Sequence, residues 1–422
     1  MGVRQGVSRL EVYEARVAES GRSRLSAKRR AREKRSTAVR ARIAVLSSTL
    51  LLASACGSAA VSTETPRAPA SSSSSPTAGP TPSALPAPAL CGSGDLEPSS
   101  VTAISEKEWW VLVEPCDNVV SHFGGGAGVF AIEHTTDGGI TFTSSSVPAD
   151  ATASDVQPQM RFADESNGWL FGPLWATHDG GHHWHPVSVD VVQLEPGADG
   201  WVFAVTSQCI DAYHCSDELR RAQAGSDNWS RVLAIPHRLP DDRFVIGVHG
   251  RTLWVIDLTA FQGALWVSYD AGDTFTSRTY PCPPINQGSD QIDPVSDTVV
   301  WAYCTDMSGG RPLVSTDSGR TWHPTNFSGT NSGVIAGISA QTAFVTAQST
   351  ALAGTTDGGA TFKRILDWAS TAAWVGFTDS RVGYAIVSPQ EQSLTEPWRT
   401  QLWRTTDGGL HWAVVQLNGS GT

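Results

Sequence analysis

The chain has 422 residues, of which 17% are charged, and its formal net charge is −11. The charge is unevenly distributed, because residues 56–422 hold 17 Lys and Arg against 37 Asp and Glu. Such an acidic region argues against nucleic acid as a partner and against attraction of the folded region to anionic lipid, since both depend on clustered basic side chains.

The first recognisable element is an export signal. Arg40 and Arg42 precede an apolar run over residues 43–55. The run is too short to span a bilayer as a helix, which needs about 20 residues. A basic flank, an apolar core and small residues before a cleavage site are typical of secretory signals. We therefore interpret residues 1–55 as a signal peptide, and we place its true start near Val39 because residues 1–38 are too long and basic for such a signal.

The sequence Ala53-Ser54-Ala55-Cys56 resembles the lipobox of bacterial lipoproteins, although Ala53 stands where Leu is commonest. The resemblance implies that Cys56 is acylated and anchors the chain to the outer face of the cytoplasmic membrane, so that membrane contact is through the lipid alone. Ordinary secretion after cleavage nearby is the alternative. Residues 56–90 are rich in Pro, Ser, Ala and Thr and are expected to form a disordered tether.

A short pattern, Ser/Thr-x-Asp-x-Gly-x-Thr/His-Trp/Phe, recurs along residues 91–422, and we call it the aspartate turn. Six copies are clear, and a weaker copy, "AGSDNW", fills the one double-length gap. The seven aspartates are Asp137, Asp179, Asp227, Asp270, Asp317, Asp357 and Asp407. Their spacings of 42, 48, 43, 47, 40 and 50 residues match the length of a four-stranded propeller blade.

The segments between these turns predict strands rather than helices. Runs such as residues 245–258 and 374–388 contain two apolar stretches joined by a polar or Gly turn. We therefore expect an all-β, seven-bladed β-propeller with four-stranded blades over residues 91–422. In each blade the Asp carboxylate should accept backbone hydrogen bonds, the Gly should take a positive φ, and the aromatic ring should pack between neighbouring sheets.

The aspartate turn resembles the Asp-box, or BNR, repeat of bacterial sialidases, sortilin-type receptors, some glycan hydrolases and photosystem II assembly-factor propellers. A sialidase also needs an Arg-Ile-Pro motif with its arginine triad, a Tyr–Glu pair and an acid/base Asp. Here "LAIP" over residues 233–236 has Ala in the place of Arg, and Tyr213, Tyr280, Tyr303 and Tyr384 have no recognisable setting. We assign no catalytic residue, and the sequence favours a protein without enzyme activity over an enzyme.

The cysteines fit an oxidising compartment. If Cys56 is lipidated, six of the seven cysteines remain and can form three disulfides. Six cysteines allow 15 pairings, and local pairing within a repeat is our choice. The predicted pairs are Cys91–Cys116, Cys209–Cys215 and Cys282–Cys304.

Two groups of side chains suggest metals, but the sequence favours structural roles for both. The stretch "HDGGHHWH" over residues 178–185 is rich in His, yet His183 and His411 occupy the Thr position of their turns. The turn aspartates have too few acidic neighbours to supply the six or more oxygens that Ca²⁺ requires. We therefore predict no metal and no cofactor.

Ligand contacts are expected on the face opposite the aspartate turns, where the long loops should lie. Trp, Tyr and Arg are the usual anchors of binding interfaces. The candidates are His122, Tyr213, His214, Tyr280, Arg311, Trp398 and Arg399. The sequence thus predicts a monomeric surface lipoprotein whose propeller binds an envelope protein, or an extracellular glycan or peptide, without catalysis. A sialidase-like glycoside hydrolase acting on extracellular glycans is the alternative.

Overall fold

The computed structural model describes residues 95–115, 130–152, 158–211, 214–235, 244–258, 263–282, 291–306, 309–329, 333–347, 351–367, 370–389 and 400–417. All of them belong to one compact unit, Ala78–Thr422. The predicted export signal, Cys56 and the tether lie outside the described residues. No helix among those described has the length and hydropathy needed to cross a membrane.

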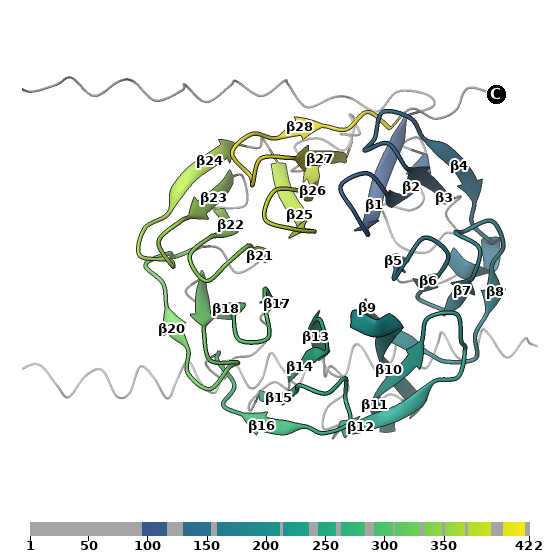
Figure 1. The fold of residues 1–422 in the computed structure, drawn as a ribbon, viewed down its shortest axis with the longest axis horizontal. Helices are drawn as coiled ribbons and strands as arrows, with labels where there is room; N and C mark the ends of the chain where they lie inside the picture. The colour runs from purple at the N-terminus through teal and green to yellow at the C-terminus, as the bar shows by residue number, and fades with distance from the viewer. Residues whose placement is uncertain are drawn as a thin grey trace, which may run out of the picture. The chain divides into compact units, whose positions relative to one another are not determined.

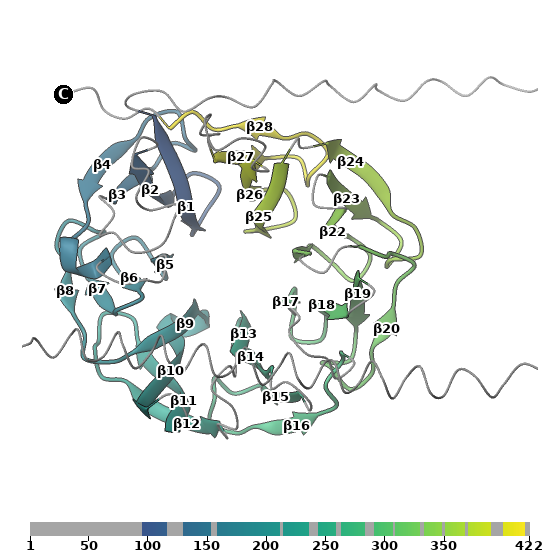
Figure 2. The same ribbon diagram turned by 180° about the vertical axis from the view of Figure 1, so that it is seen from behind.

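Seven sheets of four antiparallel strands stand in a ring, and we number them as blades 1–7 in chain order (Figures 1 and 2). Blade 1 contains β1 (Leu96–Ala103), β2 (Trp109–Pro115), β3 (Ala131–Thr135) and β4 (Thr143–Ser146). Blade 2 contains β5 (Gln159–Phe162), β6 (Gly168–Phe171), β7 (Trp175–Thr177) and β8 (His185–Pro186). Blade 3 contains β9 (Val191–Pro196), β10 (Trp201–Asp211), β11 (His214–Gln223) and β12 (Ser230–Ile235). Blade 4 contains β13 (Phe244–His249), β14 (Thr252–Asp257), β15 (Ala264–Ser268) and β16 (Thr276–Arg278).

The remaining three blades repeat this plan. Blade 5 contains β17 (Gln291–Pro294), β18 (Val300–Asp306), β19 (Gly309–Ser315) and β20 (His323–Pro324). Blade 6 contains β21 (Ile335–Gly337), β22 (Ala343–Ala347), β23 (Ala351–Thr355) and β24 (Lys363–Asp367). Blade 7 contains β25 (Ser370–Phe377), β26 (Gly383–Pro389), β27 (Gln401–Thr405) and β28 (Ala413–Val414). Two short 3₁₀ turns, η3 (Ala149–Thr152) and η4 (Ala198–Gly200), complete the described elements.

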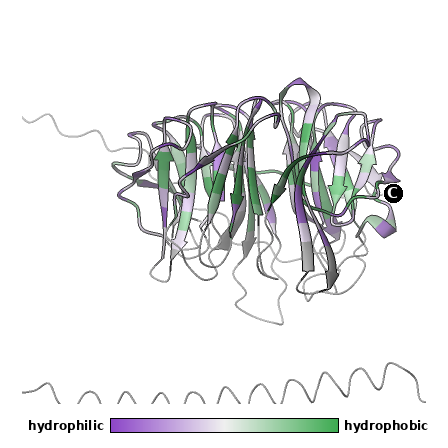
Figure 3. Ribbon diagram, turned by 90° about the horizontal axis from the view of Figure 1, so that it is seen from below, coloured by the Kyte–Doolittle hydropathy of each residue, from purple (hydrophilic) through white to green (hydrophobic). Residues whose placement is uncertain are grey.

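The strand order confirms the predicted seven-bladed fold. In every blade the strands pair in chain order, and the first strand lies innermost (Figure 1). The second strand is buried on both faces, as in β2 and β14, because neighbouring blades cover it. Strands buried on both faces need near-continuous apolar runs, which explains "WWVLV" and "TLWVI" in the sequence. Figure 3 shows these hydrophobic stretches along the strands.

The ring closes by packing between blades 7 and 1 rather than by exchange of a strand, since each of these blades is built from four consecutive strands. Val101 and Trp109 of blade 1 pack in one cluster with Tyr384 of blade 7. The Arg404 guanidinium donates to the Gly138 carbonyl at 3.0 Å and to the Glu106 carbonyl at 2.7 Å. The closure therefore combines an apolar seam with hydrogen bonds from one arginine.

Each aspartate turn connects the third and fourth strands of its blade, and Asp317 shows the geometry. Its Oδ1 accepts hydrogen bonds from the Ser315 hydroxyl and the Thr321 amide, and its Oδ2 accepts from the Thr321 hydroxyl at 2.6 Å. Gly319, at φ +76°, donates its amide to Ser315 Oγ. Because Thr321 donates twice to the carboxylate, the pKa of Asp317 falls to about 2.

The same contacts explain the Ser/Thr and Thr/His positions of the pattern. The hydroxyl before the aspartate accepts the Gly amide and donates to the carboxylate. His183 and His411 replace the second hydroxyl, with Nδ1 at 2.6 Å from Oδ2 of Asp179 and Asp407 respectively. These two histidines therefore serve their own turns.

The aromatic rings of the turns are less enclosed than the sequence suggested. Trp184 and Trp412 are only half-buried, and each donates its indole N–H to a Gly carbonyl in its own turn. The fully buried tryptophans lie instead in the second strands: Trp109, Trp110, Trp169, Trp254 and Trp301. The turn rings therefore cover the outer edge of each interface between blades, while the second-strand rings fill its centre.

Candidate functional site: the central channel

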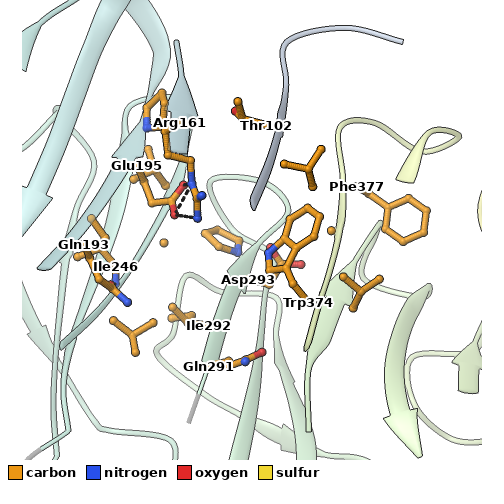
Figure 4. Close-up of a pocket in the computed structure, with 18 of the residues that line it drawn as sticks. Thr102, Arg161, Gln193, Glu195, Ile246, Gln291, Ile292, Asp293, Trp374 and Phe377 are labelled. Atoms are coloured by element: carbon orange, nitrogen blue, oxygen red, sulfur yellow. Dashed lines mark hydrogen bonds and ion pairs between the residues drawn. The ribbon is translucent and has the colours of Figure 1, made fainter. Parts of the chain in front are cut away.

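The innermost strands of all seven blades enclose a channel of about 750 Å³. Figure 4 shows part of its wall, with side chains from several blades converging on one space. A concave site that combines apolar surface with a few convergent polar groups is the usual form of a ligand pocket. The channel is therefore the candidate functional site among the described residues.

A charged pair lies in the channel wall between blades 2 and 3. Arg161 in β5 and Glu195 in β9 form a bidentate contact, with Nη2 and Nε donating to the carboxylate at 3.0–3.2 Å. A further guanidinium nitrogen of Arg161 donates to the Met160 carbonyl at 2.9 Å. The exposed fractions of the two side chains are 19% and 33%, and both residues line the channel. The bidentate geometry fixes both side chains and joins the two blades.

Other polar side chains satisfy backbone groups of the next blade. Innermost strands are sheet edges, and their unpaired N–H groups need acceptors. Gln193 Oε1 accepts the Ile246 amide at 2.9 Å, and Gln291 Oε1 accepts the Ile335 amide at 3.2 Å. Asp293 accepts the Gly337 amide in the same way. These side chains therefore hold neighbouring blades together along the channel.

Asp293 has an altered protonation equilibrium. Burial within the channel wall raises its pKa to about 7, the Gly337 amide opposes this shift, and the negative charge of Glu195 adds to it. Asp293 as a whole is half-buried, and it lines the channel. Asp293 therefore exchanges a proton near neutral pH.

Asp293→Asn should change how stability depends on pH. The folded pKa of about 7 exceeds the unfolded value of about 3.9, so the folded chain holds a proton that the unfolded chain releases. Its stabilisation is fully present below about pH 4 and is lost as the pH rises through about 7. From about pH 5 to about pH 8, the free energy of unfolding measured in urea should fall more for the wild type than for the variant. An equal difference between wild type and variant at both pH values would contradict the account.

Apolar side chains supply the rest of the wall. Ile246, Ile292 and Ile335 come from three successive innermost strands, and each has less than a tenth of its surface exposed. Trp374 in β25 is half-buried and borders the same space (Figure 4). The channel can therefore offer an indole face and aliphatic surface to a ligand, next to the Arg161–Glu195 pair.

The predicted ligand-face residues are only partly described. His122, Tyr213, Trp398 and Arg399 lie outside the described residues, and for His214 only the backbone, in β11, is described. Tyr280 is half-buried against Cys282 and Cys304, and Arg311 is exposed in β19. The ligand face therefore stays a prediction.

The structure confirms one of the three predicted disulfides. Cys282 and Cys304 form a disulfide with a Cα–Cα distance of 5.2 Å, as the local pairing predicted. Cys209 and Cys215 are opposite one another in the β10–β11 pairing. Cys91 and Cys116 lie outside the described residues.

Two tyrosines considered for a sialidase-like site are core residues. Tyr303 and Tyr384 are almost fully buried, and burial raises the pKa of each to about 12. A phenol with so high a pKa stays protonated at neutral pH, which disfavours either as a nucleophile. The positions therefore support the interpretation that no sialidase Tyr–Glu pair is built from them.

Arg161, Glu195, Asp293 and Trp374 were not among the site residues predicted from the sequence. The sequence nevertheless contains a signal for the channel wall. Polar residues stand at alternate positions of "QMRF", "VVQLEP" and "QIDP", in strands whose other residues are mostly apolar. Polar residues at inward positions of the first strand in several blades could have indicated the channel wall.

The chain was compared with known families, curated proteins and solved structures. No family model matches it, and no curated sequence matches it either. The solved structure described as YCF48 bound to D1 peptide is 14% identical, with 75% of this chain and 95% of that chain covered at a TM-score of 0.50. Acylaminoacyl peptidase of Pyrococcus horikoshii is 8% identical, with 76% of this chain and 53% of that chain covered at a TM-score of 0.51. The GH74 enzyme of Niastella koreensis is 13% identical, with 76% and 65% covered at a TM-score of 0.37. At these identities the two likenesses with TM-scores of 0.50 and 0.51 show the propeller fold alone.

Proposed function

We propose that the chain is an exported binding propeller that recognises a segment of an envelope protein, or an extracellular peptide or glycan, without catalysis. In this proposal Cys56 is acylated, residues 56–90 form the tether, and the propeller stands outside the cytoplasmic membrane. The basic flank, apolar run and lipobox-like residues before Cys56 support export and anchoring. Cys56→Ala should release the chain from the membrane fraction into the medium, and retention in the membrane would contradict anchoring through this residue.

The observation that carries the binding function is the composition of the channel wall. Its charged groups already serve the fold, since Glu195 is held by Arg161 and Asp293 accepts the Gly337 amide. The surface that remains for a ligand is the half-buried Trp374 and the aliphatic side chains around it. Rigid aromatic surface with few free polar groups favours recognition, because it costs little conformational entropy on binding.

A glycoside hydrolase is the second candidate, and one observation favours it. Retaining and inverting glycosidases use a proton-donating carboxyl group beside a second carboxylate. Asp293, with its pKa raised to about 7, could donate a proton, and Glu195 is close enough to contribute to that shift. The ion pair between Glu195 and Arg161 opposes this role, because a nucleophile or base needs a free carboxylate.

Peptides are the first ligands to test, because YCF48, which shares the fold, is described with a D1 peptide bound. Peptides would be selected from a random library on the immobilised chain, and their dissociation constants measured by fluorescence polarisation. Trp374→Ala should weaken binding about tenfold or more, as loss of a central aromatic anchor does. Ile140→Ala is the matched control, because Ile140 is 83% exposed on the outer turn of blade 1. Failure to select any peptide, or equal affinity for wild type and Trp374→Ala, would contradict a peptide site in the channel.

A further inference from the structure

Three potential metal ligands from two blades converge outside the channel. His178 lies in the turn after β7, His185 lies in β8, and Asp227 lies in the turn between β11 and β12. Their ligand atoms all lie within 4.8 Å of one another. Asp227 Oδ2 is 2.7 Å from His185 Nε2, and Asp227 Oδ1 is 3.6 Å from His178 Nε2. Blades 2 and 3 therefore share a cluster of two imidazoles and one carboxylate.

Asp227 differs from the other six turn aspartates, which accept hydrogen bonds from their own turns. In the described structure its carboxylate instead faces the two histidines of the neighbouring blade. The sequence shows why, because Trp229 follows Asp227 by two residues, whereas the aromatic ring follows the aspartate by five residues in the other copies. The shorter spacing removes Asp227 from the turn-closing position, and its two carboxylate oxygens face His185 and His178.

A contact with Asn167 orients the ring of His178. The Asn167 amide nitrogen donates to both Asp164 carboxylate oxygens at 2.9 Å, which turns Asn167 Oδ1 towards His178 Nδ1, also at 2.9 Å. An amide oxygen accepts, so Nδ1 carries the proton and a neutral ring has its lone pair on Nε2. Nε2 of the same ring lies 3.6 Å from Asp227 Oδ1, so a cation between them would have a ligand atom on each side. In metal sites, a ligating imidazole is usually oriented by a hydrogen bond from its other ring nitrogen to a neighbouring acceptor.

We propose that His178, His185 and Asp227 bind a divalent transition metal ion, with Zn²⁺ the best match. Zn²⁺ takes imidazole and carboxylate ligands at about 2.0–2.2 Å in tetrahedral geometry, which places ligand atoms roughly 3.3 Å apart. The two distances of 2.7 and 3.6 Å bracket that value. On binding, the metal replaces the proton between His185 and Asp227, and this proton passes to solvent. Three protein ligands leave one position for water or for a donor group of a partner.

The site would join blades 2 and 3 at their outer strands, so bound metal should stabilise the folded chain. An ion that binds only the folded state raises the unfolding temperature by mass action. The proposal is independent of the channel, because none of the three residues lines it. Metal binding and channel binding can therefore succeed or fail separately.

The test is a titration of the metal-free chain with Co²⁺, followed by its visible absorption spectrum, and with Zn²⁺, followed by calorimetry. The wild type should bind one equivalent of Co²⁺, and the absorption spectrum should indicate a low coordination number. His185→Ala and Asp227→Asn should abolish this binding, and Asn167→Ala should weaken it about 10- to 100-fold through loss of the imidazole orientation. Zn²⁺ should raise the melting temperature of the wild type and leave that of Asp227→Asn unchanged.

His183→Ala is the matched control. His183 lies in the same stretch and is 90% exposed by side chain, but it contacts Asp179 rather than the cluster. This variant should bind Co²⁺ and Zn²⁺ as the wild type does. The proposal is overturned if the wild type binds neither ion, if His185→Ala and Asp227→Asn retain the wild-type affinity, or if His183→Ala loses binding equally. Circular dichroism on each variant shows whether the fold is intact.

Discussion

Trp110→Ala is expected to lower the free energy of unfolding by about 3–5 kcal/mol, the usual range for removing a fully buried tryptophan. The ring has no exposed surface and lies between His134 of β3 and Phe162 of β5. Both neighbours are parallel to it, with centroid distances of 4.4 and 4.1 Å. Its indole N–H has no partner among the described atoms, so the loss is one of packing between blades 1 and 2.

Urea unfolding measured by circular dichroism checks this expectation. Ile140→Ala provides the control and should change stability by less than about 0.5 kcal/mol, because the side chain is 83% exposed. Trp184→Ala should fall between the two, since Trp184 is half-buried. If Trp110→Ala cost no more than Trp184→Ala, the assignment of the blade core to the second strands would be wrong.

Removing the Cys282–Cys304 disulfide is expected to cost about 3 kcal/mol. The bond closes a loop with a sequence separation of 22 residues. Closing a loop of that length lowers the entropy of the unfolded chain, which stabilises the folded state by about this much. Cys282 follows the last strand of blade 4, and Cys304 lies in β18 of blade 5, so the bond ties the exit of one blade to the core of the next. Both residues are buried beside Leu313.

The double variant Cys282→Ala/Cys304→Ala tests this expectation. Its free energy of unfolding is compared with that of the wild type in the same oxidising buffer, so that the other cysteines have the same redox state in both. Chemical unfolding should show a lower midpoint for the variant with a similar slope. Thiol titration of the unfolded wild type should find neither of these two sulfurs free. An unchanged midpoint would show that the bond adds no constraint to the unfolded chain.

The fold could be predicted from the repeat in the sequence. Seven aspartates at blade-length intervals, six of them followed two residues later by a Gly, predicted the number of blades and the turn between the third and fourth strands of each. The turn geometry followed as well, because each residue of the pattern acts within a few positions of the aspartate. Local contacts of this kind are encoded in consecutive residues and need no knowledge of the ring.

The channel and the metal-ligand cluster depended on contacts between blades. Arg161 and Glu195 are 34 residues apart, and only the curvature of the ring brings β5 beside β9. Asp227 was expected to close its turn, and the position of Trp229 was the signal that it does not. The burial of the second-strand tryptophans likewise depends on both neighbouring blades.

The measurement that tests the central claim most directly is capture from the cell envelope of the host, with sugar release assayed in the same sample. The full chain, its Trp374→Ala and Asp293→Asn variants and its Ile140→Ala control would be cross-linked to envelope extract. Captured proteins would be identified by mass spectrometry, and the supernatants assayed for new reducing sugars. A non-catalytic binding propeller predicts one enriched partner that is lost with Trp374→Ala, kept with Ile140→Ala and unaccompanied by sugar release. Released sugar without an enriched partner, abolished by Asp293→Asn, would contradict it and identify a glycoside hydrolase.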